Sequence, residues 1–338
     1  MRHPLVFPAV QWNRPRWRGQ RGFYEVYFLK ANVPEQGFAV WLRYTLLAPR
    51  AAPPKAELWG FVFDHRCPER NWGTKQVLPV ADTNWRECEL PLRVGEGNVM
   101  DHNLAQGSLG AHEAGLRWQL EWTPAPQGVG LFPMRWMYFL PLPRTKYLSP
   151  NWDARFFGTI AFGDTLVALH GAPAQQAHLW GTQYAEEWFW AHCNAFEDPP
   201  DAVFEMLVAS ARLGARSLRL GMLCLRVGQQ FYALRRWRAC RAMQAAGEVG
   251  RWEFVAEQDD FRVEGTVRVE PHHLLGACYE TPAGGRRYCH NTKVGDLQLR
   301  LLTRKGTLWR VEHSLEAQGT CAAEWVCLTQ DPRVRLWV

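Results

Sequence analysis

The stretch EEWFWAHCN at residues 186–194 decides how this chain is expected to fold. Its side chains alternate with a period of two, so it is expected to form a β-strand with two different faces. One face carries two indoles and three polar groups: Glu186, Trp188, Trp190, His192 and Asn194. Buried polar groups need partners, so this face predicts the wall of a polar and aromatic cavity. The alternative is a structural polar network packed with Trp.

Segments with the same period recur along the chain, separated by Gly, Pro, Asn and Asp. They lie at residues 24–29, 38–46, 58–63, 116–122, 187–194, 203–209, 217–227, 265–270, 297–303 and 308–312. Many strands at short spacing predict an all-β fold with antiparallel sheets. Residues 235–246 are rich in helix formers and predict either a helix or a long irregular strand.

Two internal similarities predict a duplication. EVYFLKAN at residues 25–32 matches EWFWAHCN at residues 187–194, and GLRWQLEW at residues 115–122 resembles GDLQLRLL at residues 295–302. Both matches favour two similar β domains, although strand segments also match by chance. Prolines near residue 145 place the expected boundary there. The predicted domains are therefore residues 1–145 and residues 146–338.

Composition limits the classes of function. The chain has 338 residues, 47% apolar and 21% charged, as expected of a folded protein. Aromatic residues make up 13%, enough to line a cavity for a bulky apolar ligand. The net charge of +6 is spread along the chain, so no nucleic-acid partner is expected. Four Arg among two Trp at residues 12–21 predict a solvated arm, with contact to nucleic acid or peripheral contact to an anionic membrane as the alternatives.

The cysteines and the missing motifs point to a cytoplasmic protein without a cofactor. Nine cysteines without regular spacing predict free thiols, and the N-terminus has no signal-peptide pattern. No apolar run reaches the roughly 18 residues of a membrane span. P-loop, Rossmann and GxSxG motifs are absent from the sequence. CxxC and HExxH spacings are absent too, so we expect neither a cofactor nor a metal.

Three segments carry a resemblance to a known family. GAPAQQAHLWGTQYAEEWFWAHCNAF at residues 171–196 resembles the motif of tocopherol cyclases, carotenoid 1,2-hydratases (hydroxyneurosporene synthases) and AttH-like proteins, which has a His, a Trp-Gly pair and a Trp-x-Trp strand ending near Asn. YEVYFLKANVPE at residues 24–35 is similar to the opening strand of tocopherol cyclases. YCHN at residues 288–291, followed by GDLQL, resembles a Cys-containing turn and a Gly-x-Leu strand of the family.

The resemblance implies a fold and a class of reaction. The fold is two lipocalin-like antiparallel β-barrel domains in tandem. The reaction protonates a prenyl double bond and traps the resulting cation. The sequence departs from the tocopherol cyclase pattern at Val26, where a Gly is expected, and at His192, where the plant cyclases have Gln. These departures put tocopherol itself in doubt as the product.

Candidate site residues follow from the matched positions. Alkene protonation requires a desolvated acid, for which Glu25 and Glu187 are the candidates. His178 or His192 would be an alternative donor or would restore the proton. The expected substrate-binding residues are Tyr27, Trp180, Trp188, Trp190, Asn194, Tyr288, His290 and Asn291.

The expected activity is that of a cofactor-free cyclase (an isomerase) or hydratase (a hydro-lyase) acting on an isoprenoid-type apolar substrate. Two alternatives stay open. One is a non-catalytic lipocalin-like binder of a lipid, a pigment or another apolar small molecule, because such barrels commonly hold ligands unchanged. The other is an interaction protein whose family site no longer works.

Overall fold

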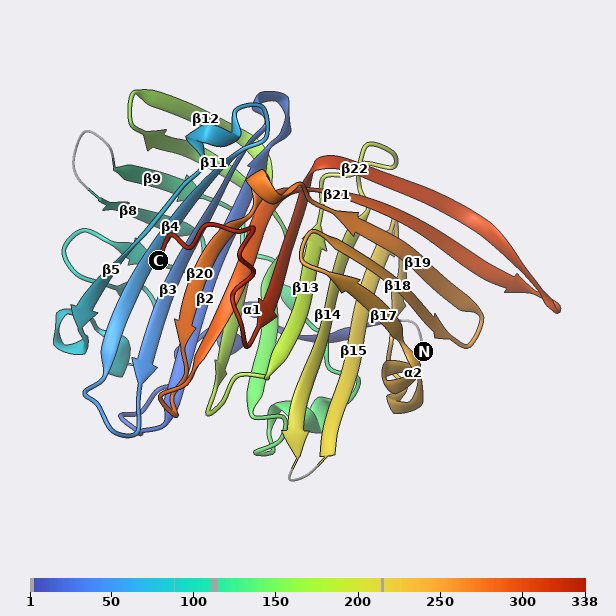
Figure 1. Cartoon of the computed structure of the whole chain (residues 1–338), viewed down its shortest axis with the longest axis horizontal. Coiled ribbons are helices and arrows are strands. Elements are labelled where there is room, and N and C mark those ends of the chain that lie inside the picture. The colour runs from blue at the N-terminus through green and yellow to red at the C-terminus, as the bar shows by residue number, and fades with distance from the viewer. Residues whose placement is uncertain (1–2, 88, 111–114, 214–215) are drawn as a thin grey trace.

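The chain forms two curled antiparallel sheets, each a half-barrel (Figure 1). The computed structural model describes residues 3–87, 89–110, 115–213 and 216–338. Strands dominate, so the predicted all-β class is confirmed. The helices are short: α1 (Ala9–Trp12), α2 (Trp237–Ala242), η1 (Pro34–Gln36), η2 (Pro68–Arg70), η3 (Val80–Asp82), η4 (Trp85–Glu87), η5 (Arg135–Tyr138) and η6 (Pro271–His273).

The first sheet is built from the N-terminal half of the chain. Its order is β5 (Trp72–Pro79), β4 (Lys55–Asp64), β3 (Phe38–Ala48), β2 (Phe23–Val33), β12 (Thr165–Gly181), β11 (Thr145–Phe162), β9 (Leu116–Glu121), β8 (Leu104–Leu109), β7 (Val99–Met100) and β6 (Leu92–Arg93). β1 (Leu5–Pro8) pairs with β10 (Gln127–Gly130), which joins β11.

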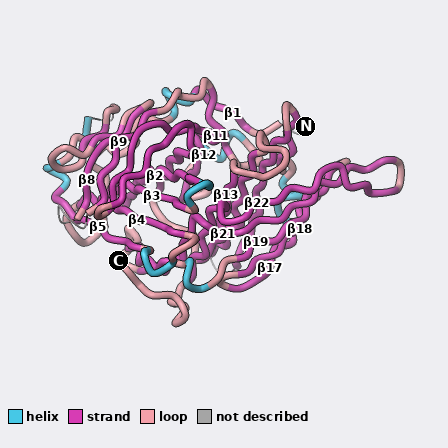
Figure 2. Tube along the Cα trace, turned by 90° about the horizontal axis from the view of Figure 1, so that it is seen from above, coloured by secondary structure: helices cyan, strands magenta, loops and turns pink. Residues whose placement is uncertain are grey.

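The second sheet has the same arrangement. Its order is β16 (Gln230–Ala233), β15 (Arg216–Val227), β14 (Val203–Leu213), β13 (Glu187–Cys193), β22 (Leu308–Cys327), β21 (Arg286–Lys305), β19 (Phe261–Arg268), β18 (Arg251–Gln258) and β17 (Gln244–Glu248), and β20 (Leu275–Glu280) pairs with β21. The far end of the β21–β22 hairpin projects from the body of the molecule (Figure 2).

Strand order relates the two sheets to the internal matches. β2 lies between β3 and β12, and β13 lies between β14 and β22, so the segments EVYFLKAN and EWFWAHCN hold equivalent places. The second match does not correspond: GLRWQLEW lies in β9, whose counterpart is β19, whereas GDLQLRLL lies in β21. Strands of one periodicity resemble one another regardless of position, and this match reflects only that.

Sheet membership changes later in the chain than the expected boundary at residue 145. β11 and β12 pair with β9 and β2, so the first sheet extends to Gly181. The prolines before Thr145 belong to a loop within the first half rather than to a linker. Residues 235–246 combine both predictions, because they contain helix α2 and the start of β17.

The two half-barrels pack through β21, which contacts β2, β3 and β4 of the first sheet. This arrangement buries one face of β2 and one face of β13 against the opposite half. Eight cysteines lie in the described part of the chain, all as free thiols, and Cys88 lies outside it. No helix among the described residues is long and apolar enough to cross a bilayer.

Candidate functional site

The interface between the half-barrels holds one group of the expected residues. The ring of Phe28 on β2 lies 5.5 Å, centroid to centroid, from that of Trp190 on β13. Lys30, two residues after Phe28, donates from Nζ to Oδ1 of Asn194, which lies four residues after Trp190, at 3.1 Å. The even-numbered residues of both strands therefore face each other, as the alternation along residues 186–194 predicts.

A buried carboxyl group, Glu205 on β14, lies beside Trp190. It accepts hydrogen bonds from Ser149 Oγ at 2.9 Å, Gln175 Nε2 at 2.7 Å, Trp190 Nε1 at 3.1 Å and the Tyr147 hydroxyl. All four donors are neutral, and no ion pair to Glu205 occurs within the described part of the chain. Burial raises the pKa of Glu205, and its hydrogen bonds oppose that shift only in part. The site therefore favours the protonated acid more than water does.

Two buried lysines lie near this acid, in the same interface. Lys30 donates to Asn32 Oδ1 at 3.2 Å as well as to Asn194, and burial lowers its pKa to about 8. Lys293 on β21 donates to Asn291 Oδ1 and lies 3.5 Å from Glu324 Oε1. Its Nζ is 5.0 Å from the centroid of the Trp41 ring, within the range of a cation–π contact.

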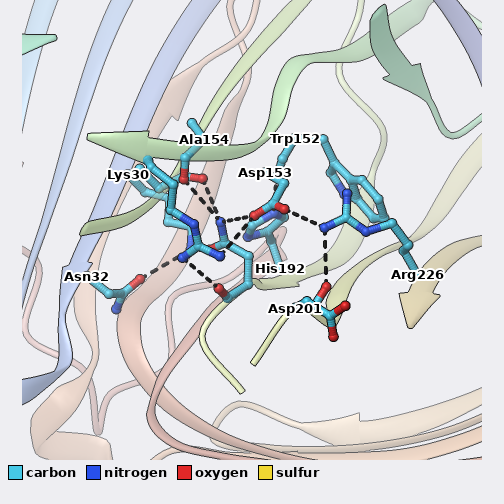
Figure 3. A network of polar contacts seen from close by, with 11 residues as sticks. Lys30, Asn32, Trp152, Asp153, Ala154, His192, Asp201 and Arg226 are labelled. Carbon is cyan, nitrogen blue, oxygen red and sulfur yellow. Dashed lines mark hydrogen bonds and ion pairs between the residues drawn. The ribbon is translucent and has the colours of Figure 1, made fainter. Parts of the chain in front are cut away.

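The hydrogen bond from Lys30 to Asn194 is part of a larger polar network around Asp153 (Figure 3). Asn194 Nδ2 donates to Asp153 Oδ1 at 3.1 Å, and Asp153 is paired with Arg226. His192 lies beside this network with its Nε2 2.9 Å from the carbonyl oxygen of Trp152. Burial and the charge of Lys30 lower the pKa of His192 well below its usual value, so the imidazole is neutral at pH 7.

An aromatic group surrounds Arg43 at another part of the interface. The Arg43 guanidinium lies 4.0 Å from the centroid of the Tyr279 ring, and its Nη2 donates to the Tyr184 hydroxyl at 3.2 Å. Tyr184 stacks on Tyr24 at 3.9 Å and on Trp188 at 5.8 Å. Trp188 therefore belongs to the interface, but it stacks on the two tyrosines that contact Arg43 rather than lying beside Glu205.

A second carboxyl centre lies on the other face of β2. Glu25 is buried and accepts four hydrogen bonds: from Arg16 N at 2.6 Å, Trp17 N at 3.1 Å, Trp85 Nε1 at 2.8 Å and His178 Nε2 at 2.8 Å. Four donors suit a carboxylate, and they tie the N-terminal arm to the sheet.

Rings cover the His178 side of this centre. Tyr27 stacks on the imidazole at 4.1 Å, and Trp180 lies 4.7 Å from it, so Glu25, Tyr27, His178 and Trp180 converge as a group. Burial lowers the pKa of His178, and the hydrogen bond to Glu25 partly opposes that shift.

The structure thus separates the expected site into two centres. Glu25 and Tyr27 occupy one face of β2, whereas Phe28 and Lys30 occupy the face toward Trp190, because successive side chains of a strand point in opposite directions. Trp188, Trp190, His192, Asn194 and Asn291 lie in the interface.

Three expected residues lie outside both centres. Glu187 is exposed, and Tyr288 is half-buried at the start of β21. His290 is buried, but its Nδ1 donates to the carbonyl oxygen of Trp325 at 3.1 Å and its Nε2 accepts from Asp331 N at 2.9 Å. The alternation of β21 directs Tyr288 and His290 away from the face that carries Asn291.

The motifs in the sequence did not single out Glu205, Tyr147, Gln175 or the two interface lysines. A signal was present, because Glu205 is the one polar residue in the run at residues 203–209, and Lys30 stands between Leu29 and Ala31. A charged residue at an inward position of a buried strand indicates a buried polar centre.

Other features of the described residues lie away from these centres. A groove of about 540 Å³ crosses β17, β18, β19, β21 and β22 and is lined by polar side chains such as Glu253, Glu264 and Arg300. No three His, Cys, Asp or Glu side chains converge to hold a metal ion in the part of the chain that the structure describes.

Comparisons with known proteins place the fold. Residues 21–324 match a family model described as tocopherol cyclase-like. Two uncharacterized proteins of Mycobacterium tuberculosis, from strains CDC 1551 and H37Rv, are 23% identical over 91% of this chain and 90% of theirs.

Three solved structures share the fold at low sequence identity. A putative AttH from Nitrosomonas europaea gives a TM-score of 0.55 at 9% identity and covers 98% of both chains. Kievitone hydratase from Nectria haematococca gives 0.53 at 9% identity, and CghA with Sch210972 gives 0.54 at 12% identity. Each of these two covers 91% of this chain and 89% of its own.

Proposed function

The chain belongs to the tocopherol cyclase-like family, and we propose on this premise that it is an enzyme of the cyclase or hydratase type. The observation that carries the proposal is Glu205, a buried acid with a raised pKa that is held by four neutral donors. Protonation of an unactivated alkene requires a carboxylic acid that keeps its proton near neutral pH. The shared fold of kievitone hydratase supports the proposal, because that protein is a hydratase.

The first step of the proposed reaction is proton transfer from Glu205 to a carbon of the substrate double bond. A new C–H bond forms, the substrate becomes a cation, and Glu205 becomes a carboxylate. Trp190 donates its indole N–H to Glu205, and its ring lies at the interface beside Phe28. Aromatic faces stabilise a desolvated cation by up to about 2 kcal/mol each.

The second step is capture of the cation by an oxygen, either of water or of a substrate hydroxyl. Asn194 can orient that oxygen, and Lys30 is the base we assign. A C–O bond forms, the O–H proton passes to uncharged Lys30, and its return to the Glu205 carboxylate restores both groups. The pKa of Lys30, about 8, lets it release and accept a proton close to neutral pH. Gln175, which donates to Glu205, lies opposite Lys30 in the β12–β2 register, so the acid and the base are close neighbours.

The substrate class is apolar and isoprenoid-like, which the rings of the interface support. The ring of Phe28 lies 6.4 Å from that of Trp41 and 5.5 Å from that of Trp190, and all three rings are buried. Glu25 is not our choice for the acid. It accepts four hydrogen bonds, two of them from backbone N–H groups of the N-terminal arm, and it lies on the face of β2 opposite to Phe28 and Lys30.

The experiment uses three carboxylate-to-amide variants. Purified wild-type protein and the variants Glu205→Gln, Glu25→Gln and Glu187→Gln are incubated with lipid extract of the source cells, and mass spectrometry follows bound and converted compounds. We expect the wild type and Glu187→Gln to accumulate an isomer or a hydrate. Glu205→Gln should bind the same compound and convert it at least about 100-fold more slowly.

The pH dependence of the rate gives a second test, and two results would contradict the proposed reaction. The rate should fall at high pH, because only protonated Glu205 donates, and at low pH, because Lys30 accepts a proton only in its uncharged form. An unchanged apolar ligand recovered from the wild type and Glu205→Gln alike would identify a binder instead. Turnover retained in Glu205→Gln but lost in a folded Glu25→Gln variant would move the reaction into the first half-barrel.

A further inference from the structure

The loop before β11 exposes an unusual concentration of large apolar side chains. Trp136, Phe139, Leu140 and Leu142 are 47%, 63%, 52% and 48% exposed, all within seven residues. The other exposed apolar residues among those described are scattered over strands, hairpins and the C-terminal end. Scattered apolar residues need no explanation, but a cluster marks a surface that meets an apolar partner.

This exposure is held in place by the fold. Met137 and Tyr138 lie within the same turn and are buried, and the Tyr138 hydroxyl donates to the carbonyl oxygen of Tyr147 at 2.7 Å. Lys146 Nζ donates to the carbonyl oxygens of Leu140 at 2.7 Å and Pro143 at 2.5 Å. The apolar side chains therefore project from a braced loop.

The charge around the loop has a single sign. Residues 3–24 and 123–152 together contain six Arg, one Lys, which is buried, and no Asp or Glu. The two segments touch, since Trp12 lies 5.5 Å from Phe139 and the Arg135 guanidinium lies 4.7 Å from the centroid of the Phe7 ring. Thr145 and Tyr24 both pair with Gly181, so the loop and the N-terminal arm meet at the same end of the sheet.

We propose that this end of the molecule binds the surface of an anionic lipid bilayer. Trp136, Phe139, Leu140 and Leu142 insert among the acyl chains next to the headgroups, and the arginines of the loop and the arm contact the anionic headgroups. Tryptophan and leucine beside cationic residues are the composition of an interfacial membrane anchor. A protein partner of opposite charge would satisfy the arginines but would not explain four apolar side chains projecting from a braced turn.

The proposal refines the role of the N-terminal arm. Trp17 is buried and Trp12 is half-buried, so neither ring is free to insert. The arm contributes charge, and the loop contributes the apolar contact. Tyr138 of the loop is hydrogen-bonded to the carbonyl oxygen of Tyr147, whose hydroxyl donates to Glu205. The proposed membrane-binding surface is therefore close to the proposed catalytic acid. The surface itself does not depend on the reaction proposed above.

The test is co-sedimentation of the full chain with vesicles of phosphatidylcholine alone and of phosphatidylcholine with phosphatidylglycerol. We expect binding to the anionic vesicles that weakens as salt concentration rises. The double variant Phe139→Ser/Leu140→Ser should lower the partition coefficient at least about tenfold, because it removes inserted apolar area. Leu166→Ser/Leu308→Ser is the matched control, since both residues are exposed apolar residues of distant hairpins.

Arg135→Gln/Arg144→Gln tests the charge. It should weaken binding to anionic vesicles and flatten the salt dependence. All variants change exposed side chains, and circular dichroism checks that they fold. The proposal is overturned if the wild type binds neither kind of vesicle or if Phe139→Ser/Leu140→Ser binds as the wild type does. A concentration-dependent dimer that this variant abolishes, without vesicle binding, would make the loop a contact between copies of the chain.

Discussion

The equivalent strands β2 and β13 give the sharpest comparison within the molecule. Their matched segments, residues 25–32 and 187–194, both begin with Glu and end with Asn, and the strands occupy the same place in their sheets. On β2 the Glu is buried under four hydrogen bonds, and Tyr27 stacks on His178 of the neighbouring strand. On β13 the Glu is exposed, and Phe189 lies opposite Trp325 and packs on Trp252.

The difference teaches that position in the fold does not set the chemistry. Of these two equivalent strands, β2 carries a buried polar group around Glu25, whereas the corresponding face of β13 packs against apolar rings. The N-terminal arm makes the difference, because it brings the Arg16 and Trp17 N–H groups to Glu25. The faces toward the interface remain alike: Asn32 and Asn194, which are equivalent, both accept from Lys30.

The largest expected effect is at the two equivalent carboxylates. Glu25→Gln should lower the free energy of unfolding by about 3 kcal/mol, because the amide N–H₂ would face hydrogen-bond donors in a buried site. Glu187→Gln should change it by less than about 0.5 kcal/mol, since this side chain is exposed. Urea denaturation measures both, and equal losses would contradict the comparison.

The second effect concerns Lys30, which joins the two strands. Its pKa is lowered to about 8, so between pH 8 and the unfolded value the unfolded chain binds one more proton than the folded chain. The free energy of unfolding should therefore rise with pH in that range, by up to about 3 kcal/mol from this group. Below pH 8 the cost of the buried charge is fully present.

Lys30→Met removes that dependence. The variant should be at least as stable as the wild type at pH 7, because an apolar chain of similar length replaces a buried cation. The advantage should shrink as pH rises above 8, and urea denaturation at pH 7 and pH 9.5 gives the two values. Parallel pH profiles for the two proteins would show that Lys30 keeps its ordinary proton affinity in the interface.

The smallest expected effects on the free energy of unfolding come from exchanging Phe and Tyr at the equivalent positions 189 and 27. Phe189→Tyr should cost about 2 kcal/mol, because its hydroxyl would lie among the rings of Trp252 and Trp325. Tyr27→Phe should cost about 1 kcal/mol through loss of the hydrogen bond to the carbonyl oxygen of Asn13 at 2.9 Å. Thermal unfolding ranks the two, and the reverse order would show that the second half-barrel tolerates a polar group as well as the first.

The sequence predicted which residues of one strand share a face, but it did not predict which residues of different strands meet in the candidate site. Alternation along β13 correctly grouped Trp188, Trp190, His192 and Asn194 on one face. It also implied that Glu25 and Phe28 face opposite ways. No local pattern could show that Glu205 would meet Tyr147, because these residues are 58 positions apart and lie in different sheets.

The sequence by itself determined the all-β class, the equivalence of residues 25–32 with residues 187–194 and the two faces of each strand. These properties are local, because period-two alternation acts over a few residues. Only the tertiary structure decided which faces meet, how far the first sheet extends and which acid is buried beside neutral donors. Those outcomes depend on contacts between distant segments, and burial at such contacts sets the proton affinities of Glu205 and Lys30.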